Sequence, residues 1–220
     1  MILIPVKNLS SAKQRLASVL DQLARTELAQ AMLHDVVAAV AAWPARPAAA
    51  LVTSDLFAMD LARKYDFEII PDPANPGETG AIEMATRICM ERGIEATLVI
   101  PADIPLIKVS ELEEILAQAP GEGSVLVPAA DGRGTNAAFR RPADLFPLRF
   151  GNDSFKPHLA AAQATGKPCR MLHLPGIALD VDNPADLQNL LSSDRGTRTQ
   201  NLLRRWRLGD VFLATGTERL

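Results

Sequence analysis

The chain has 220 residues, of which 48% are hydrophobic and 22% are charged, a composition typical of a folded globular domain and not of a disordered chain. Its 23 basic and 26 acidic residues give a net charge of −3, which excludes a strong general attraction to nucleic acid or anionic membranes. No apolar stretch approaches the ~20 residues of a membrane-spanning helix and no leader-like segment opens the chain, so we expect a cytoplasmic protein.

Strand-like and helix-like segments alternate in the first half of the chain. Short apolar runs predict strands at residues 1–6, 48–53, 67–70 and 97–100. Helical spacing and cap residues predict helices at residues 21–42, 55–65 and 80–92, the last with Thr79 as its N-cap. This alternation indicates an α/β protein with a three-layer α/β/α fold and a mostly parallel, mixed sheet.

The second half of the chain is less regular. We expect helices at residues 110–118, 155–165 and 184–191, and strands at residues 124–128, 137–140, 170–174 and 177–179. After Ser192 the chain becomes polar and basic, which indicates a terminal extension whose order the sequence leaves open. We therefore divide the chain into one domain, residues 1–191, and a basic C-terminal extension, residues 192–220.

The loop at residues 7–15 is the first segment that could bind a ligand, because ligands of parallel α/β sheets lie at the carboxyl ends of the strands. It carries the cations Lys7, Lys13 and Arg15 together with serine hydroxyl groups. Cations and backbone N–H groups at a helix start can bind a polyphosphate, although the loop lacks the spacing of a P-loop. The alternative is a solvated loop whose cations only keep the helix soluble.

Two acidic segments are candidates for a metal site. Asp103 directly follows the most apolar strand, where a carboxylate can hold Mg²⁺ against phosphate oxygens; the alternative is an Asp that caps a helix or turn. Asp180 and Asp182 are two residues apart, which places both on one face of a predicted strand, and such a pair repels unless a cation lies between them. We expect Asp180 to bind the metal and Asp182 mainly to serve the following turn, where Asn183 is the alternative helix cap.

Two glycine-bearing turns, at residues 131–136 and 150–158, follow in the second half. The first formally matches the G-x-G-x-x-A dinucleotide fingerprint, but a strand-like segment and not a helix follows it, so we reject a dinucleotide fold. The groups that could instead bind an anion are the donors of Thr135, Asn136 and Ser154, with added charge from Lys156 and His158. Without further information, ordinary turns are the simpler interpretation.

Six short motifs occur along the chain in a fixed order. They are Ile4-Pro5-Val6-Lys7 with Ala12-Lys13-Gln14-Arg15-Leu16, Val52-Thr53-Ser54-Asp55, Pro101-Ala102-Asp103-Ile104-Pro105-Leu106, Gly132-Arg133-Gly134-Thr135-Asn136, Phe150-Gly151 with Ser154-Phe155, and Leu179-Asp180-Val181-Asp182. This ordered set, over residues 1–191, resembles the 2-phospho-L-lactate guanylyltransferase family (CofC and FbiD type) of coenzyme F-420 biosynthesis.

The resemblance implies a single-domain nucleotidyltransferase with a MobA-like, glycosyltransferase-A-like fold. Such an enzyme transfers GMP from GTP to a three-carbon phosphoacid and releases pyrophosphate. The family's acceptors are 2-phospho-L-lactate, phosphoenolpyruvate or 3-phospho-D-glycerate, depending on the member. The expected partners are therefore GTP and a small phosphoacid, with no nucleic acid and no membrane, and a homodimer is left open.

Site residues follow from the resemblance and from the segments above. The expected cofactor is Mg²⁺, and the expected metal ligands are Asp103, Asp180 and Asp182. The expected catalytic residues are Lys13, Asp103 and Asp180. The expected nucleotide-binding residues are Pro5, Val6, Lys7, Lys13, Arg15, Thr53, Thr79 and Asp103. The expected acceptor-binding residues are Thr135, Asn136, Gly151 and Ser154.

One segment departs from the family pattern. Family members usually carry Gly-Leu-Asn before an Ala-rich helix, whereas this chain has Gly77-Glu78-Thr79, with Thr79 in the place of the Asn. Because that Asn borders the nucleotide, the base, the sugar contacts and the acceptor stay open. Two alternatives also stay open: a transferase for a sugar-phosphate or molybdopterin-type acceptor, and a nucleotide-binding relative that has lost catalysis.

Overall fold

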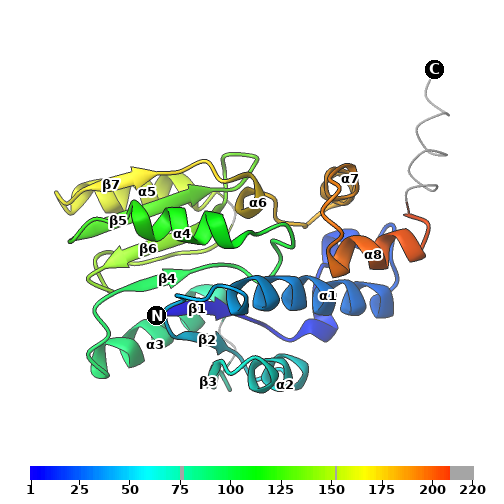
Figure 1. Cartoon of the computed structure of the whole chain (residues 1–220), viewed down its shortest axis with the longest axis horizontal. Coiled ribbons are helices and arrows are strands. Elements are labelled where there is room, and N and C mark those ends of the chain that lie inside the picture. Colours follow the sequence, from blue (N-terminus) through cyan, green and yellow to red (C-terminus); the bar gives the residue numbers. More distant parts are fainter. Residues whose placement is uncertain (75–76, 152, 209–220) are drawn as a thin grey trace.

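The computed structural model describes residues 1–74, 77–151 and 153–208. A seven-stranded sheet runs through the described part of the chain (Figure 1). Its strands are β1 (Ile2–Pro5), β2 (Ala49–Val52), β3 (Glu68–Ile70), β4 (Thr97–Val99), β5 (Gly123–Pro128), β6 (Thr135–Arg141) and β7 (Cys169–Met171). Their order is β3-β2-β1-β4-β6-β5-β7, and only the pairs that include β6 are antiparallel. The predicted mostly parallel, mixed sheet is confirmed.

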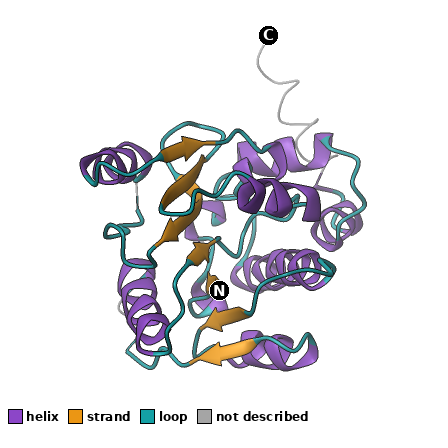
Figure 2. Ribbon diagram, turned by 60° about the vertical axis from the view of Figure 1, so that its left-hand side comes forward, coloured by secondary structure: helices purple, strands orange, loops and turns teal. Residues whose placement is uncertain are grey.

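Helices cover both faces of the sheet and form the predicted three layers (Figure 2). One face packs against α1 (Gln22–Ala41), α2 (Leu56–Lys64), α4 (Val109–Ala117) and the short α6 (Pro175–Ala178). The other face packs against α3 (Glu78–Glu91) and α5 (Phe155–Ala164). The remaining elements are the 3₁₀ turns η1 (Leu9–Ser11) and η2 (Gln14–Leu16) and the helices α7 (Pro184–Ser192) and α8 (Arg198–Arg205).

Strand β1 shows why the sheet has two apolar cores. Successive side chains of a strand point to opposite faces, so Ile2 and Ile4 pack on the α1 side while Leu3 packs on the α3 side. All three are fully buried, which explains why the segment is a continuous apolar run in the sequence. Because β1 and β4 are parallel neighbours, the loops that follow them meet at one edge of the sheet.

The structure corrects two predicted elements. Residues 177–179 form no strand, because Pro175 begins helix α6 there, in the first-turn position that proline favours. Helix α3 begins earlier than predicted: Gly77 is its N-cap, at a φ of +98° that glycine adopts without strain. Thr79 therefore lies inside the first turn of α3 and is not its cap.

The segment after residue 191 contains a helix, α8, that the sequence analysis did not predict. The Asp35 carboxylate on α1 accepts hydrogen bonds from the backbone N–H groups of Arg198 at 2.9 Å and Thr199 at 2.8 Å. Leu203 of α8 is fully buried in one cluster with Leu28 and other apolar residues of α1. Part of the basic segment thus packs on the core, and the domain boundary at residue 191 stays a prediction.

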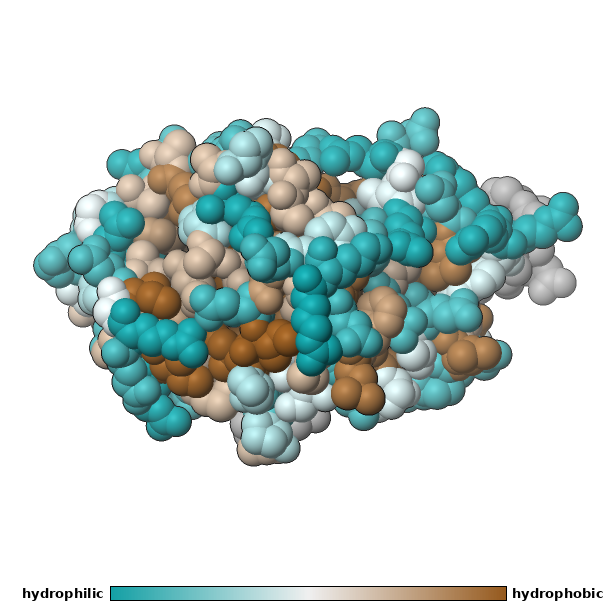
Figure 3. Space-filling view, turned by 60° about the horizontal axis from the view of Figure 1, so that its bottom comes forward, coloured by the Kyte–Doolittle hydropathy of each residue, from teal (hydrophilic) through white to brown (hydrophobic). Residues whose placement is uncertain are grey.

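The surface carries scattered apolar side chains. Figure 3 shows one face of the molecule, on which hydrophilic residues predominate and apolar groups gather in patches. The large exposed apolar residues in the described part of the chain are Leu23, Leu56, Phe57, Met90 and Met171. Exposed apolar side chains are normal on a protein surface. No helix in the described ranges is long and apolar enough to cross a bilayer.

Candidate active site

Two cavities adjoin at the edge of the sheet where β1 and β4 end. The first cavity, of about 390 Å³, is lined mainly by the loop at residues 5–15. The second cavity, of about 570 Å³, is lined by residues of the turns 129–136 and 150–154 and of the segment 180–183. The residues that line both cavities are Arg15, Glu78, Pro101, Asp103 and Asp182. The predicted phosphate loop and the predicted glycine turns therefore lie on opposite sides of one shared wall.

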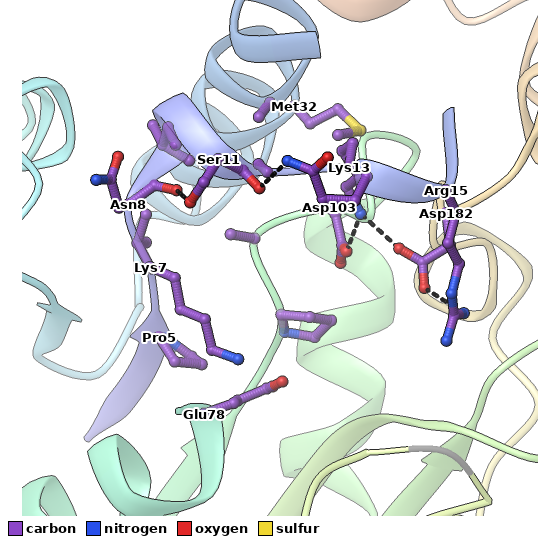
Figure 4. Close-up of a pocket in the computed structure, with 17 residues that line it drawn as sticks. Pro5, Lys7, Asn8, Ser11, Lys13, Arg15, Met32, Glu78, Asp103 and Asp182 are labelled. Atoms are coloured by element: carbon purple, nitrogen blue, oxygen red, sulfur yellow. Dashed lines mark hydrogen bonds and ion pairs between the residues drawn. The ribbon is translucent and has the colours of Figure 1, made fainter. Parts of the chain in front are cut away.

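Lys13 lines the first cavity and joins two acidic residues of the shared wall. It lies between η1 and η2 with a φ of +55°, and its Nζ is 2.5 Å from Asp103 Oδ2 and 2.8 Å from Asp182 Oδ1 (Figure 4). Burial alone would lower the pKa of Lys13, but the two carboxylates raise it above its ordinary value. The ammonium group is therefore charged at any physiological pH.

Asp182 has a different role from the one predicted. Its carboxylate binds Lys13 and also lies 3.6 Å from the Arg15 guanidinium. Burial raises the pKa of Asp182, but the charge of Lys13 outweighs it and holds the pKa below its ordinary value. The turn before α7 is instead capped by Asn183, whose side chain accepts from the N–H groups of that helix.

Asp180 lies beside this pair in an extended segment and not on a strand. The N–H of Val181 donates to the carbonyl of Asp103 at 3.1 Å, which holds the two acidic segments together. Asp180 accepts a hydrogen bond from Asn136 Nδ2 at 3.0 Å. Burial raises the pKa of Asp180, and the hydrogen bond only partly offsets this. Both Asp103 and Asp180 line the second cavity.

The arrangement of the acidic residues suits a Mg²⁺ site with two carboxylates, Asp103 and Asp180, better than one with three. Within the described ranges, no three His, Cys, Asp or Glu side chains are grouped so as to hold a metal ion, and the Lys13 ammonium lies between Asp103 and Asp182. However, Asp103 Oδ1 is buried without a hydrogen-bond partner. Mg²⁺ commonly binds through one or two carboxylates and substrate phosphates, so Asp103 and Asp180 suffice in number and type.

Glu78 is a site residue that the sequence analysis missed. It lies in the first turn of α3, lines both cavities, and points toward Lys7 from the opposite wall (Figure 4). Burial, and next the negative charge of Asp103, raise the pKa of Glu78 to about 7. The available signal was its position directly after Gly77, where it replaces an apolar residue of the family pattern.

The predicted nucleotide-binding residues are only partly brought together. Those that line the first cavity are Pro5, Val6, Lys7, Lys13, Arg15 and Asp103. Thr53 is fully buried, and its hydroxyl accepts from the Asp55 N–H at 3.0 Å. The Thr79 hydroxyl accepts from the Phe150 N–H at 2.9 Å. Neither threonine lines either cavity, so their contact with a nucleotide stays a prediction.

All four predicted acceptor-binding residues line the second cavity: Thr135, Asn136, Gly151 and Ser154. The Thr135 N–H donates to Ser154 Oγ at 3.1 Å, so the two turns are joined. His158 does not supply the positive charge that we expected. The residue is 1% exposed, and burial, with a further effect of Arg140, lowers the pKa of its ring to about 4.

The sequence matches a known family over almost its whole length. A family profile described as guanylyl transferase CofC-like matches residues 1–219. The chain belongs to this family. As a member, it is a nucleotidyltransferase.

Curated relatives differ in the acceptor that their names give. The chain is 34% identical to a phosphoenolpyruvate guanylyltransferase of Sphaerobacter thermophilus, over 85% of this chain and 90% of that protein. It is 30% identical to a 2-phospho-L-lactate guanylyltransferase of Methanothermobacter thermautotrophicus, over 99% of this chain and 95% of that protein. It is 31% identical to a 3-phospho-D-glycerate guanylyltransferase of Colwellia psychrerythraea, over 86% of this chain and 90% of that protein.

Solved structures support the fold. A candidate nucleotide-diphospho-sugar transferase from Desulfovibrio desulfuricans G20 has a TM-score of 0.74 at 20% identity, over 93% of each chain. A nucleotidyl transferase from Methanothermobacter thermautotrophicus has a TM-score of 0.60 at 16% identity, over 93% of this chain and 99% of that chain. The predicted nucleotidyltransferase fold is thus confirmed.

Proposed function

We propose that this protein transfers GMP from GTP to a small three-carbon phosphoacid, with release of pyrophosphate, as a step in coenzyme F-420 biosynthesis. One observation carries the proposal: a cavity lined by the cationic loop at residues 7–15 and a cavity lined by the two glycine-bearing turns share a wall, in which Asp103 and Asp182 bind Lys13. Transfer between two phosphate-bearing substrates needs two such adjoining compartments. The names of the curated relatives supply the guanylyl group and the class of acceptor.

The first cavity suits the nucleoside triphosphate. Lys7, Lys13 and Arg15 line it together with the backbone of the loop at residues 7–15, and cations stabilise phosphate oxygens by charge-assisted hydrogen bonds. Arg15 also lines the second cavity, next to Asp182. It can therefore bind a phosphate at the boundary between donor and acceptor.

The second cavity suits the phosphoacid. Thr135 and Ser154 line it with their hydroxyl groups, and Arg133 lines the same cavity with a cationic side chain. A phosphate oxygen of the acceptor attacks the α-phosphorus of GTP; a new oxygen–phosphorus bond forms while the bond to the β-phosphate oxygen breaks, and pyrophosphate leaves. Because the attacking oxygen is already an anion, the step needs no general base, and no imidazole of the described residues lines either cavity.

Asp103 and Asp180 would hold Mg²⁺ in this reaction. When bound, the ion neutralises phosphate charge as it builds up during transfer. The residues of the chain keep the geometry around it: Lys13 holds Asp103 in place, and Asn136 holds Asp180.

The test is product mass spectrometry with all candidate substrates in competition. The protein, Mg²⁺ and GTP are mixed with equal amounts of phosphoenolpyruvate, 2-phospho-L-lactate and 3-phospho-D-glycerate, and parallel mixtures contain ATP, CTP or UTP. We expect one GMP conjugate to predominate and pyrophosphate to appear in equal amount. Absence of every conjugate, or conjugates of another nucleotide in greater amount, would contradict the proposal.

A further inference from the structure

We propose that His158 is a positioning residue of the second cavity, which fixes the Thr135 hydroxyl as a hydrogen-bond donor toward the acceptor's phosphate or carboxylate. The inference rests on the proposed function, since it assumes an anionic acceptor in that cavity. His158 itself does not line the cavity. It acts through Thr135, which does.

The protonation of the His158 ring follows from a backbone donor. The N–H of Arg149 donates to His158 Nε2 at 2.7 Å, so Nε2 must carry a lone pair and no proton. A neutral imidazole has a single ring proton, which therefore resides on Nδ1. Thr135 Oγ1 lies 2.9 Å from Nδ1, so His158 is the donor in this hydrogen bond and Thr135 is the acceptor.

This arrangement leaves the Thr135 proton available for a ligand. A hydroxyl group has one proton and two lone pairs. One lone pair of Thr135 Oγ1 accepts from His158, and the other faces the Ser154 hydroxyl, which donates at 3.4 Å. The Ser154 oxygen in turn accepts from the Thr135 N–H at 3.1 Å. With both lone pairs used in this way, the Thr135 proton is available to a ligand in the second cavity, which Thr135 lines.

The same ring also fixes the loop beside the cavity. His158 holds Arg149, and the adjacent Phe150 is held from the other side, because the Thr79 hydroxyl accepts from its N–H at 2.9 Å. The Phe150 ring packs edge-on against the imidazole, with ring centroids 5.3 Å apart. Gly151, which follows, lines the cavity. One buried side chain thus makes hydrogen bonds to both walls of the second cavity.

A pair of substitutions separates the two nitrogens of the ring. The amide of Asn reaches the position of Nδ1, so His158→Asn keeps a donor to Thr135 and loses the acceptor for Arg149. The amide of Gln reaches the position of Nε2, so His158→Gln keeps the acceptor and loses the donor to Thr135. We expect His158→Gln to raise the KM for the acceptor about tenfold with the KM for GTP changed less than twofold. The acceptor KM of His158→Asn should lie closer to the wild-type value. His34 lies on α1 and lines neither cavity, so the control His34→Gln should have the wild-type acceptor KM.

A double-mutant cycle tests whether His158 acts through Thr135. Thr135→Val should raise the acceptor KM, and adding His158→Gln should change it less than twofold further. The acceptor is whichever of the three phosphoacids the competition experiment identifies. Equal loss of affinity for GTP and acceptor, a smaller effect of His158→Gln than of His158→Asn, or multiplicative effects in the double variant would each overturn the proposal and leave His158 a core residue.

The ring proton can be observed without any activity. In the wild-type protein at pH 7, ¹⁵N chemical shifts of the His158 ring should show a neutral imidazole with its proton on Nδ1. A proton on Nε2 or a charged ring would overturn the proposal, even if the variants do not fold. If no phosphoacid is converted, the proposed function fails, and the ¹⁵N measurement still decides the ring's protonation separately.

Discussion

Lys13 holds together charges from three separate parts of the chain. It comes from the loop after β1, Asp103 from the loop after β4, and Asp182 from the segment before α7. A buried pair of carboxylates repels unless a cation lies between them, and here an ammonium group of the protein takes that place. Asp103 Oδ1 keeps no hydrogen-bond partner, and Asp103 and Asp180 are the carboxylates that we propose as metal ligands.

Replacing Asp103 by Asn tests this assignment. The substitution keeps the shape of the side chain but removes the charge that faces Lys13 and the second cavity. Loss of one electrostatic element of this kind typically lowers the rate about a hundred- to a thousandfold, and we expect that loss in pyrophosphate release from GTP and acceptor. The matched control is Asp60→Asn, an exposed ion pair on α2, which should keep wild-type turnover. Near-normal turnover of Asp103→Asn would remove Asp103 from the metal site.

Glu78 gives a prediction for stability against pH. Its pKa is raised to about 7 in the folded protein, so between the unfolded value near 4.5 and pH 7 only the folded form holds the proton. The stability that this proton contributes is lost as the pH rises through 7. The Gln side chain does not titrate. As the pH rises from 5 to 8, the free energy of unfolding of Glu78→Gln should therefore increase relative to that of wild type by on the order of 2 kcal/mol.

Urea unfolding at several pH values measures this difference. The exposed Glu83, on the same helix, provides the control Glu83→Gln, which should follow the wild-type curve. The free energies of unfolding of Glu78→Gln and wild type are compared at each pH. If their difference stays constant from pH 5 to pH 8, folding does not raise the pKa of Glu78 and the prediction is wrong.

Most of the residues that the sequence predicted for the site line one of the two cavities, whereas Thr53 and Thr79 line neither and Glu78 was missed. Lys13 lies in the loop after β1 and Asp103 in the loop after β4, so the sheet-edge rule selects both, and Asp180 belongs to an acidic motif. Thr53 also stands at such an edge, but its hydroxyl is used within its own turn. Glu78 was missed because its site role depends on the start of α3, which Gly77 and not Thr79 determines.

At the scale of elements, helix α8 packs in one apolar cluster with α1 and α7. Its buried residues are Thr199, Gln200, Leu202 and Leu203, while its arginines face solvent. Replacing Leu203, which is fully buried among residues of α1 and α7, by Ala should lower the free energy of unfolding by about 3 kcal/mol. The control Leu23→Ala removes a leucine of α1 that is 69% exposed and should cost less than about 0.5 kcal/mol. Equal effects of the two variants in urea unfolding would contradict the packing of α8.

Elements whose burial is local were predictable, and those whose burial depends on distant partners were not. The apolar residues of α1 recur at helical spacing and those of β1 and β4 form short apolar runs, so the local sequence predicts all three elements. Helix α8 is rich in arginine, and its N-terminus is capped partly by Asp35 from α1, which no local pattern reveals. The short α6 was taken for a strand because four residues are too few to show a helical period, although Pro175 marked its start.

At the scale of the whole molecule, the fold class was predictable but the order of the strands was not. Local periodicity cannot show that β6 lies antiparallel between β4 and β5. This placement brings Thr135, at the start of β6, next to the loop that follows β4. It is therefore what joins the wall of the second cavity to Asp103.

His158 links this site to the stability of the whole molecule under acid. Burial and the charge of Arg140 lower its pKa to about 4, whereas an unfolded histidine titrates near 6.5. Between these values the unfolded chain takes up a proton that the folded protein excludes, so stability falls as the pH falls from about 6.5 to 4, by roughly 3 kcal/mol from this group. His158→Gln cannot titrate, so its disadvantage against wild type should shrink over that range. Urea unfolding at pH 7, 6, 5 and 4.5 measures this difference in the free energy of unfolding. The control is His173→Gln, at an exposed position. If the difference between wild type and His158→Gln does not change with pH, the folded protein accommodates the charged ring and the prediction is wrong.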